Sequence, residues 1–144
     1  MISNAFRRSV VFTVCAVLSS PLAAFADDIT FEVALSGPEL GDPDGAATGT
    51  VTLNAASNQV SVQLRYTNIA APAALFIRRG ALGTEGNVVM PIVIESAAGG
   101  ALEGHRASAK PNLVETILAQ PDQYYLVVMN DEYPVGALRG PLSE

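Results

Sequence analysis

Few side chains in this sequence could act as nucleophiles, general bases or soft metal ligands. The 144 residues include one cysteine, Cys15, one histidine, His105, one lysine, Lys110, and no tryptophan. A serine–histidine–aspartate triad would have to use His105, and a thiolate nucleophile would have to use Cys15. Because there is no second imidazole, a zinc or copper site built on several histidines is excluded.

His105 is a weak candidate for a general base or a metal ligand. It lies beside Arg106 in a polar stretch between Gly104 and Pro111, with Glu103 two residues before it. A general base needs a nucleophile and an orienting acid within reach, and the sequence contains no nucleophile-elbow pattern. We therefore predict a solvated loop histidine that makes no contact with a buried carboxylate. No catalytic residue, metal or cofactor is predicted.

An acidic stretch offers the oxygen ligands that calcium prefers. Glu39, Asp42 and Asp44 precede Gly45 in a loop between apolar segments, but their spacing does not fit the EF-hand loop. Aspartate and the sequence Pro-Asp-Gly also form turns without any ion. The pattern favours a turn and leaves calcium open.

Arg78 and Arg79 form the one basic pair of the chain beyond its first 26 residues. On an acidic protein such a pair could contact an anion or a partner. Adjacent residues of a strand point to opposite faces, so both arginines cannot hold one anion unless the strand has ended. We expect salt bridges at the rim and keep a partner contact as the functional alternative.

Arg139 lies in an apolar terminal segment and is flanked by Gly136 and Gly140. We predict a structural arginine that pairs with an inner carboxylate, such as Glu95 or Glu132, or that caps loop carbonyls. The glycines would permit a bulge or a close backbone approach.

Three tyrosines, Tyr124, Tyr125 and Tyr133, lie near the end of the chain. Exposed tyrosines favour partner or carbohydrate surfaces. One of the adjacent pair should belong to the core. The other should be exposed, and we assign that role to Tyr124. Tyr124, Tyr133, Arg78 and Arg79 form the predicted partner surface.

Residues 1–26 have the features of a secretory signal. Arg7 and Arg8 precede an apolar run, and Ala24 and Ala26 form a small-x-small cleavage signature. The apolar run is too short to span a bilayer. We predict cleavage after Ala26, with loss of Cys15 and no remaining membrane span, and leave open whether export uses the general or the twin-arginine route.

Cleavage would leave 118 of the 144 residues, with all 14 acidic residues and only six of the basic ones. Such a chain repels phosphate backbones, so nucleic-acid binding is not expected. Without cysteine it has no disulfides and must rest on its hydrophobic core.

The elements that must position these residues are mostly strands. Apolar and polar residues alternate over residues 30–35, 50–53 and 60–66, which is typical of half-buried strands. Residues 88–94 and 124–129 are more continuously apolar, as expected for central strands covered on both faces. Turn-rich segments separate the strands, so the pattern predicts a sandwich or barrel.

Two local features interrupt the strand pattern. Pro91 indicates a bulge or an edge in its strand. A short helix is predicted near residues 112–118, with Asn112 at its start, Glu115 three residues later and Pro121 at its end.

The order of motifs resembles the chordin (CHRD) domain family over nearly all of residues 27–144. The resemblance rests on the following segments: Phe31–Gly37, Ala47–Leu53, Arg79-Gly80 with Gly83-x-x-Gly86, Tyr125–Val128, and Pro134-x-Gly136-x-x-Arg139-Gly140-x-Leu142. It implies an extracytoplasmic, all-β, antiparallel Greek-key sandwich, immunoglobulin-like or similar to copper/zinc superoxide dismutase. It also implies that Gly136, Arg139 and Gly140 form a structural motif.

The sequence departs from the family where histidines are usual. Members usually carry His-x-His before the Arg-Gly pair and another histidine before the final hairpin, where this chain has Leu75-Phe76-Ile77 and Val128–Asn130. If the family histidines bind a metal or a ligand, this chain has lost that capacity, and the apolar replacements would add to the core.

These observations favour a noncatalytic, secreted or periplasmic module that binds a protein or an envelope ligand. The alternatives are a hydrolase that uses carboxylates alone, a relative of superoxide-handling sandwiches, or a degenerate metal-binding sandwich. A carboxylate pair in a cleft would favour the hydrolase, and we predict that no such pair exists.

Overall fold

The computed structural model of the chain describes residues 28–38, 41–108 and 110–142. Within these ranges eight strands, one α-helix and one short 3-10 helix follow one another. Their bounds are β1 (Ile29–Ser36), β2 (Ala46–Asn54), β3 (Gln59–Thr67), β4 (Ala74–Arg79), β5 (Asn87–Ser96), β6 (Ala101–Ala107), α1 (Leu113–Ala119), η1 (Pro121–Gln123), β7 (Tyr124–Met129) and β8 (Leu138–Pro141).

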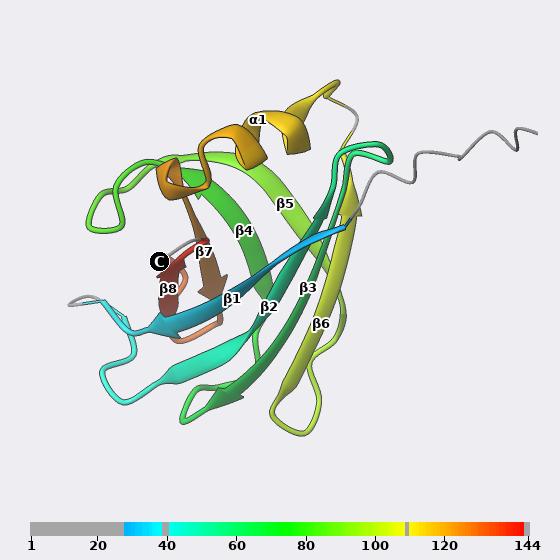
Figure 1. The fold of residues 1–144 in the computed structure, drawn as a ribbon. Helices are drawn as coiled ribbons and strands as arrows, with labels where there is room; N and C mark the ends of the chain where they lie inside the picture. Colours follow the sequence, from blue (N-terminus) through cyan, green and yellow to red (C-terminus); the bar gives the residue numbers. More distant parts are fainter. Residues whose placement is uncertain (1–27, 39–40, 109, 143–144) are drawn as a thin grey trace, which may run out of the picture.

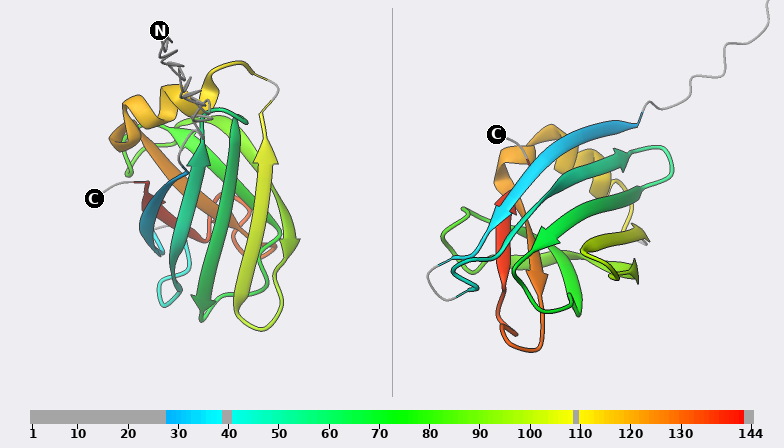
Figure 2. Two further views of the ribbon diagram at one scale, coloured as in Figure 1. Left: turned by 45° about the vertical axis from the view of Figure 1, so that its right-hand side comes forward. Right: turned by 90° about the horizontal axis from the view of Figure 1, so that it is seen from below.

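The strands form one closed antiparallel barrel in the order β1-β2-β3-β6-β5-β4-β7-β8 (Figures 1 and 2). The hairpins β1–β2–β3 and β4–β5–β6 are each formed by neighbours in sequence. The chain then crosses from β3 to β4, which places β6 beside β3 and β7 beside β4.

The predicted sandwich is right in being all-β and antiparallel, but two separate sheets do not form. β8 pairs with β7 along one edge and reaches β1 along the other, where Ser36 pairs with Arg139. Gly140 permits this approach, because a Cβ there would collide with the carbonyl oxygen of Ala34. Closure pairs strand edges that an open sheet would leave exposed.

Aliphatic side chains from every strand fill the interior of the barrel. The strand alternation seen in the sequence is realised on β3, where Val60, Val62 and Leu64 are buried and their neighbours are exposed. β7 is buried on both faces, as predicted. β5 is not, because Val88 and Val93 are 46% and 51% exposed, which corrects the prediction for residues 88–94.

Pro91 lies within β5 at a place where its missing N–H costs little. It pairs with Phe76 of β4, whereas the pairing of β5 with β6 begins at Val93. The predicted irregularity occurs just before it, where the register of β4 and β5 shifts between Ile77 and Arg78.

Helix α1 lies across one end of the barrel (Figure 1) and buries Leu113, Val114 and Ile117. The position of α1 confirms the predicted helix near residues 112–118. Asn112 does not cap it with its side chain, because this residue adopts a left-handed conformation and makes no side-chain hydrogen bond to the helix. Asn58, in the β2–β3 turn, instead accepts a hydrogen bond from the Val114 N–H at 3.0 Å. No helix among the described residues is long and apolar enough to cross a bilayer.

Candidate functional site

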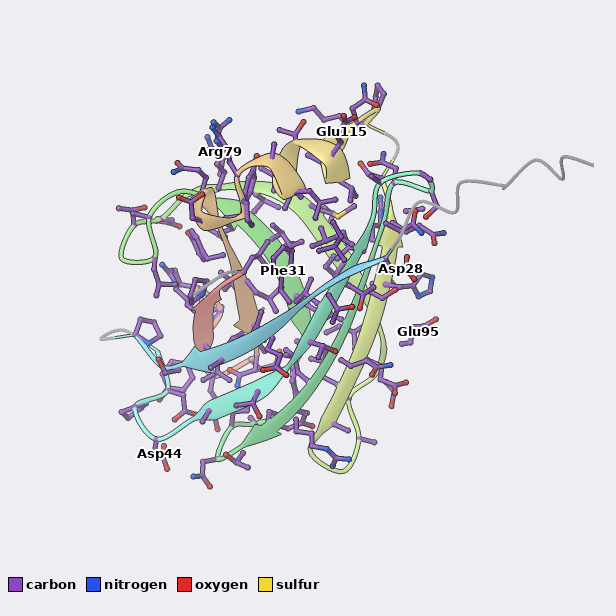
Figure 3. The ribbon with its side chains drawn as sticks, viewed as in Figure 1. Asp28, Phe31, Asp44, Arg79, Glu95 and Glu115 are labelled. Atoms are coloured by element: carbon purple, nitrogen blue, oxygen red, sulfur yellow. The ribbon has the colours of Figure 1, made fainter. Side chains whose placement is uncertain are left out.

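Arg78 and Arg79 point in different directions, as expected for neighbours on a strand. The side chain of Arg78 is 11% exposed and lies on the outer face of the barrel, in register with Tyr125 of β7. Arg79 is exposed and projects from the end of the barrel that carries η1 and α1 (Figure 3). The two therefore do not form one anion site.

The structure instead brings Arg78 towards Arg139, which is 61 positions later in the sequence. Nη1 of Arg78 donates to the carbonyl oxygen of Gly86 at 3.2 Å, and Nη1 of Arg139 donates to that of Thr84 at the same distance. Both guanidinium groups thus hold the loop between β4 and β5, residues 80–86, against the outside of β7.

Tyr125 lies between these contacts and joins them. Its hydroxyl donates to the carbonyl oxygen of Thr84 and accepts from the N–H of Gly86, both at 2.8 Å. The guanidinium carbon of Arg139 lies 5.8 Å from the centre of the tyrosine ring, within range of a cation–π contact. We call Arg78, Tyr125 and Arg139 the arginine cluster.

The glycines of the predicted structural motif make room for the arginine cluster. Gly136 has a φ of +143°, and a Cβ there would lie 3.4 Å from Nε of Arg139. Gly86 lies so close to β4 that a Cβ would collide with the carbonyl oxygen of Arg79. Sequence reasoning missed Tyr125 and Thr84 as members of this site, although the Gly83-x-x-Gly86 spacing marks their loop.

Of the two partners that the sequence suggested for Arg139, a carboxylate and a loop carbonyl, the structure selects the carbonyl. Arg139 contacts Thr84, and neither Glu95 nor Glu132 lies within salt-bridge distance of it. Glu85 lies 3.8 Å from Nη1 of Arg78 with a side chain that is 69% exposed. Nε of Arg78 and Nε of Arg139 are both buried and have no hydrogen-bond partner among the described residues.

The predicted partner surface loses one of its tyrosines. Tyr124 is 3% exposed and Tyr125 is 1% exposed, because β7 is covered inside by the core and outside by the loop of residues 80–86. Tyr124 therefore cannot present its side chain to a partner. Tyr133 is half-buried and packs against the core.

The acidic loop forms a tight turn, as the sequence pattern favours. The carbonyl of Asp42 accepts from the N–H of Gly45 at 3.3 Å, around Pro43 and Asp44. The side chain of Asp42 hydrogen-bonds to Asp44, and this contact, burial, and the charges of Asp44 and Glu132 raise the pKa of Asp42. No described residues form a group of three or more potential ligands suited to a metal ion, and Glu39 lies outside the described residues.

Burial, followed by the charges of Asp42, Glu132 and Asp44, raises the pKa of Tyr133. This phenol and the three carboxylates lie where the β1–β2 and β7–β8 connections meet, and there the Asp42 N–H donates to the carbonyl oxygen of Ala137 at 3.1 Å. Asp42 and Asp44 lie within one tight turn, which does not place their carboxyls on opposite sides of a sugar bond.

His105 lies on β6, which corrects the prediction of a loop. The buried Leu102 and Gly104 alternate with the exposed Glu103 and His105, as in a strand with one face turned inwards. Its Nδ1 is 3.0 Å from Oε1 of Glu95, and both side chains are more than half exposed. Glu95 occupies an irregularity in the pairing of β5 with β6, which turns it towards His105. As predicted, the contact is not with a buried carboxylate.

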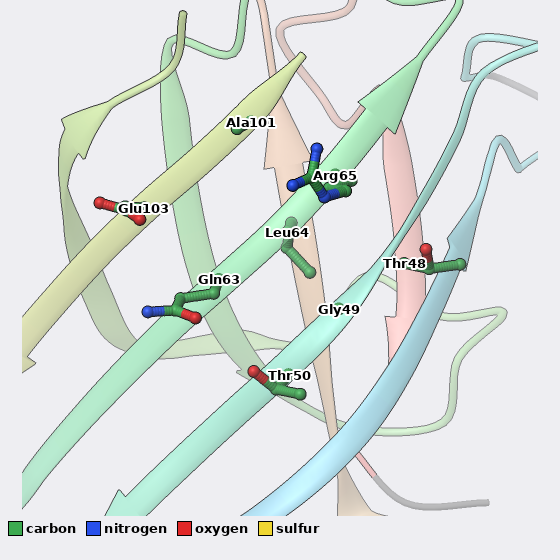
Figure 4. Close-up of a pocket in the computed structure, with 8 residues that line it drawn as sticks. All are labelled: Thr48, Gly49, Thr50, Gln63, Leu64, Arg65, Ala101 and Glu103. Atoms are coloured by element: carbon green, nitrogen blue, oxygen red, sulfur yellow. The ribbon is translucent and has the colours of Figure 1, made fainter. Parts of the chain in front are cut away.

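Two shallow grooves of about 360 and 380 Å³ lie on the outer face of the barrel, on either side of Gly49. Polar residues from four neighbouring strands follow one another across them, because Glu32 pairs with Thr50, Thr50 with Gln63 and Gln63 with Glu103. Figure 4 shows Thr50, Gln63 and Glu103 of this row. It also shows Thr48 and Arg65, which pair with each other on β2 and β3. The grooves lie on β1, β2, β3 and β6 and the arginine cluster lies on β4, β7 and β8, with β8 next to β1 where the barrel closes.

Comparison with known proteins agrees with the arrangement of these motifs. No curated protein and no solved structure matches the chain significantly. A family model, the CHRD domain, matches residues 31–142 and so covers β2 to β8 and most of β1. Of the motifs that carried the resemblance, Arg139-Gly140 supplies Arg139 of the arginine cluster and Gly83-x-x-Gly86 forms part of the loop that covers it, whereas Arg79 lies outside the cluster. The chain therefore belongs to the CHRD domain family.

Proposed function

We propose that this CHRD-domain protein is a noncatalytic, exported module that binds a protein or an envelope ligand through the outside of its barrel. The observation that carries the proposal is the contrast between the two faces of the sheet. Aliphatic side chains close the interior, whereas the outer face of β1, β2, β3 and β6 has open polar grooves. A ligand would therefore meet the outer surface.

The surroundings of the titratable groups also favour binding over catalysis. His105 and Glu95 form an exposed pair in a shallow hollow of about 200 Å³ that Glu103 also lines, where water would compete for any substrate proton. Leu75 and Ile77, at the positions where the family usually has histidines, are buried in the core. They add to its packing and offer no metal ligand.

The grooves suit a polar, extended ligand. The row Glu32, Thr50, Gln63 and Glu103 offers carboxylate, hydroxyl and amide groups at successive strands, and Arg65 adds one positive charge beside it. Neighbouring strands are about 4.8 Å apart, so these groups could contact successive units of an extended chain. The rigid closed barrel would preorganise this surface.

Export rests on the pattern of residues 1–26, and secreted or periplasmic placement is part of the proposal. Mass spectrometry of protein recovered from the extracytoplasmic fraction of the producing cell tests it directly. We expect a chain that begins at Asp27. An intact leader, or protein confined to the cytosol, would contradict export.

Capture of ligands from an envelope extract by the immobilised mature domain tests the binding surface. Thr50→Lys would place a long side chain in both grooves, so we expect it to reduce the captured amount at least tenfold. Thr67→Lys adds the same charge at an exposed position of β3 outside the grooves and should leave capture unchanged. Equal capture by both variants would show that the grooves are not the binding surface.

A further inference from the structure

We infer that the arginine cluster is a binding site for an oxyanion, a carboxylate or phosphate group, which the paired Arg78 and Arg139 would hold beside Tyr125. This site lies on β4, β7 and β8 and shares no lining residue with the grooves of the proposed function, although β8 neighbours β1. Binding at this site therefore does not require binding in those grooves.

The arginine cluster concentrates positive charge in an acidic chain. The sequence has 14 acidic and eight basic residues, yet two of its seven arginines contact the same loop, where close carboxylates are lacking. Among the described residues, Arg139 has no carboxylate within 4.0 Å, and Arg78 has only Glu85 at 3.8 Å. The guanidinium of Arg78, whose side chain is 11% exposed, lacks a close counter-ion, and this is costly, so an anion would be stabilised at this position.

The arginine cluster has more hydrogen-bond donors than its loop contacts use. A guanidinium group has five N–H donors, and each arginine of the cluster uses Nη1 for one loop carbonyl at 3.2 Å. Charge-assisted bonds to an anionic oxygen are shorter, about 2.7–2.9 Å. Both Nε atoms are buried without an acceptor. Buried donors of this kind call for an acceptor, and two of them on arginines that hold the same loop point to an oxyanion.

The loop of residues 80–86 lies against the arginine cluster. The carbonyl oxygens of Gly86 and Thr84 each occupy one Nη1 donor, and an entering anion would take the place of these weak contacts. Residues 81–85 are exposed, and Gly83 has no atom within 4 Å of where its Cβ would be, so the loop has room to shift. The exposed carboxylate of Glu85 is then an internal competitor for Arg78.

The arginine Nε–Hε signals in a ¹H–¹⁵N NMR spectrum of the mature domain test the inference. We would titrate inorganic phosphate and, separately, acetate at constant ionic strength balanced with sodium chloride. Saturable shifts of the Arg78 and Arg139 signals are expected, with little change at Arg79, which points elsewhere and serves as an internal control. The two titrations distinguish a phosphate from a carboxylate ligand.

Two variants make the test specific to this site. Glu85→Gln removes the internal competitor and should tighten binding by about threefold to tenfold. Arg139→Lys keeps the charge but loses the planar fork, and should weaken binding by about tenfold. Arg79→Gln should leave the affinity unchanged. Absence of saturable shifts in both the wild type and Glu85→Gln, or equal shifts at Arg79, would overturn the inference.

Discussion

At the scale of single residues, the neighbours that matter are those across strands. Arg78 and Arg79 are adjacent in sequence but point apart, whereas Arg78 and Arg139 hold the same loop. Tyr125 connects them because its hydroxyl meets two loop backbone groups. The alternation of side chains along a strand predicts that Arg78 and Arg79 point apart. Only the order of the strands reveals that Arg78 and Arg139 hold the same loop.

Tyr125→Phe should release the loop of residues 80–86 while leaving the barrel folded. The variant loses two hydrogen bonds to that loop, so we expect about 1–2 kcal/mol of destabilisation in urea unfolding. Hydrogen exchange at the Gly86 amide should accelerate as well. Tyr124→Phe is the matched control, because the Tyr124 hydroxyl makes no hydrogen bond to other described residues. An equal cost for both variants would contradict the role assigned to Tyr125.

Asp42 should make folding depend on pH in a defined direction. Its pKa is raised above 3.8 in the folded chain, so the folded state holds a proton that the unfolded state releases first. The free energy of unfolding should therefore decrease as pH rises from 3.8 through the folded pKa.

Asp42→Asn removes this titration, so the stability of the variant relative to the wild type should increase over the same pH range. Urea unfolding at a series of pH values from 3 to 7 measures the difference, with the exposed Asp122→Asn as control. If the free energy of unfolding of Asp42→Asn relative to the wild type stays constant, or decreases as pH rises, the predicted direction is wrong.

At the scale of elements, α1 depends on a residue of a distant turn. Asn58 accepts from the Val114 N–H, and its Nδ2 donates to the carbonyl oxygens of Ser108 and Lys110. It therefore fixes both the start of α1 and the segment that leads to it. Local sequence placed the helix correctly because Leu113 and Ile117 share a face, but it could not identify a cap 56 positions away.

Asn58→Gly should destabilise the protein by about 2 kcal/mol, through loss of a helix cap and two further hydrogen bonds. Glycine tolerates the φ of 54° at this position, so the change isolates the side chain. Asn112→Gly is matched to it, with a φ of 58° and no capping bond, and should be close to neutral. Thermal unfolding measures the melting temperatures of the two variants, and we expect that of Asn58→Gly to be lower. Similar melting temperatures would show that the Asn58 side chain does not stabilise the start of α1.

The strand pattern of the sequence succeeded where one face of a strand is apolar and the other polar. Residues 60–66 alternate clearly, and β3 has that burial pattern. β6 was missed, because its inward positions include Gly104, and because Glu103, His105 and Arg106 are exposed and together resemble a polar loop. β5 was predicted to be doubly covered, although Val88 and Val93 remain exposed.

At the scale of the whole molecule, closure of the barrel is the feature that sequence reasoning could not supply. It depends on the meeting of Ser36 in β1 with Arg139 in β8, near opposite ends of the described chain. Periodicity reports which face of a strand is buried, but not which strand lies at its edge. A sandwich and a barrel have the same alternation, so the two could not be distinguished.

Gly140→Ala should weaken this closure. The added methyl group would collide with the carbonyl oxygen of Ala34, and relief of that overlap requires β1 and β8 to separate. We expect about 2–3 kcal/mol of destabilisation, with faster amide exchange in β1. Gly83→Ala adds a methyl group in open space and serves as control. Equal stability of the two variants would show that β8 does not approach β1 so closely.

The central claim is that this protein works by binding on the outside of a filled barrel, without turnover. Native mass spectrometry of the mature domain with a molecule captured from the envelope extract tests it most directly. The account predicts a stoichiometric complex in which the bound molecule keeps its mass over hours, and which Thr50→Lys abolishes. Conversion of that molecule into a product, lost on substitution of a single residue such as Glu95 or Asp42, would contradict it.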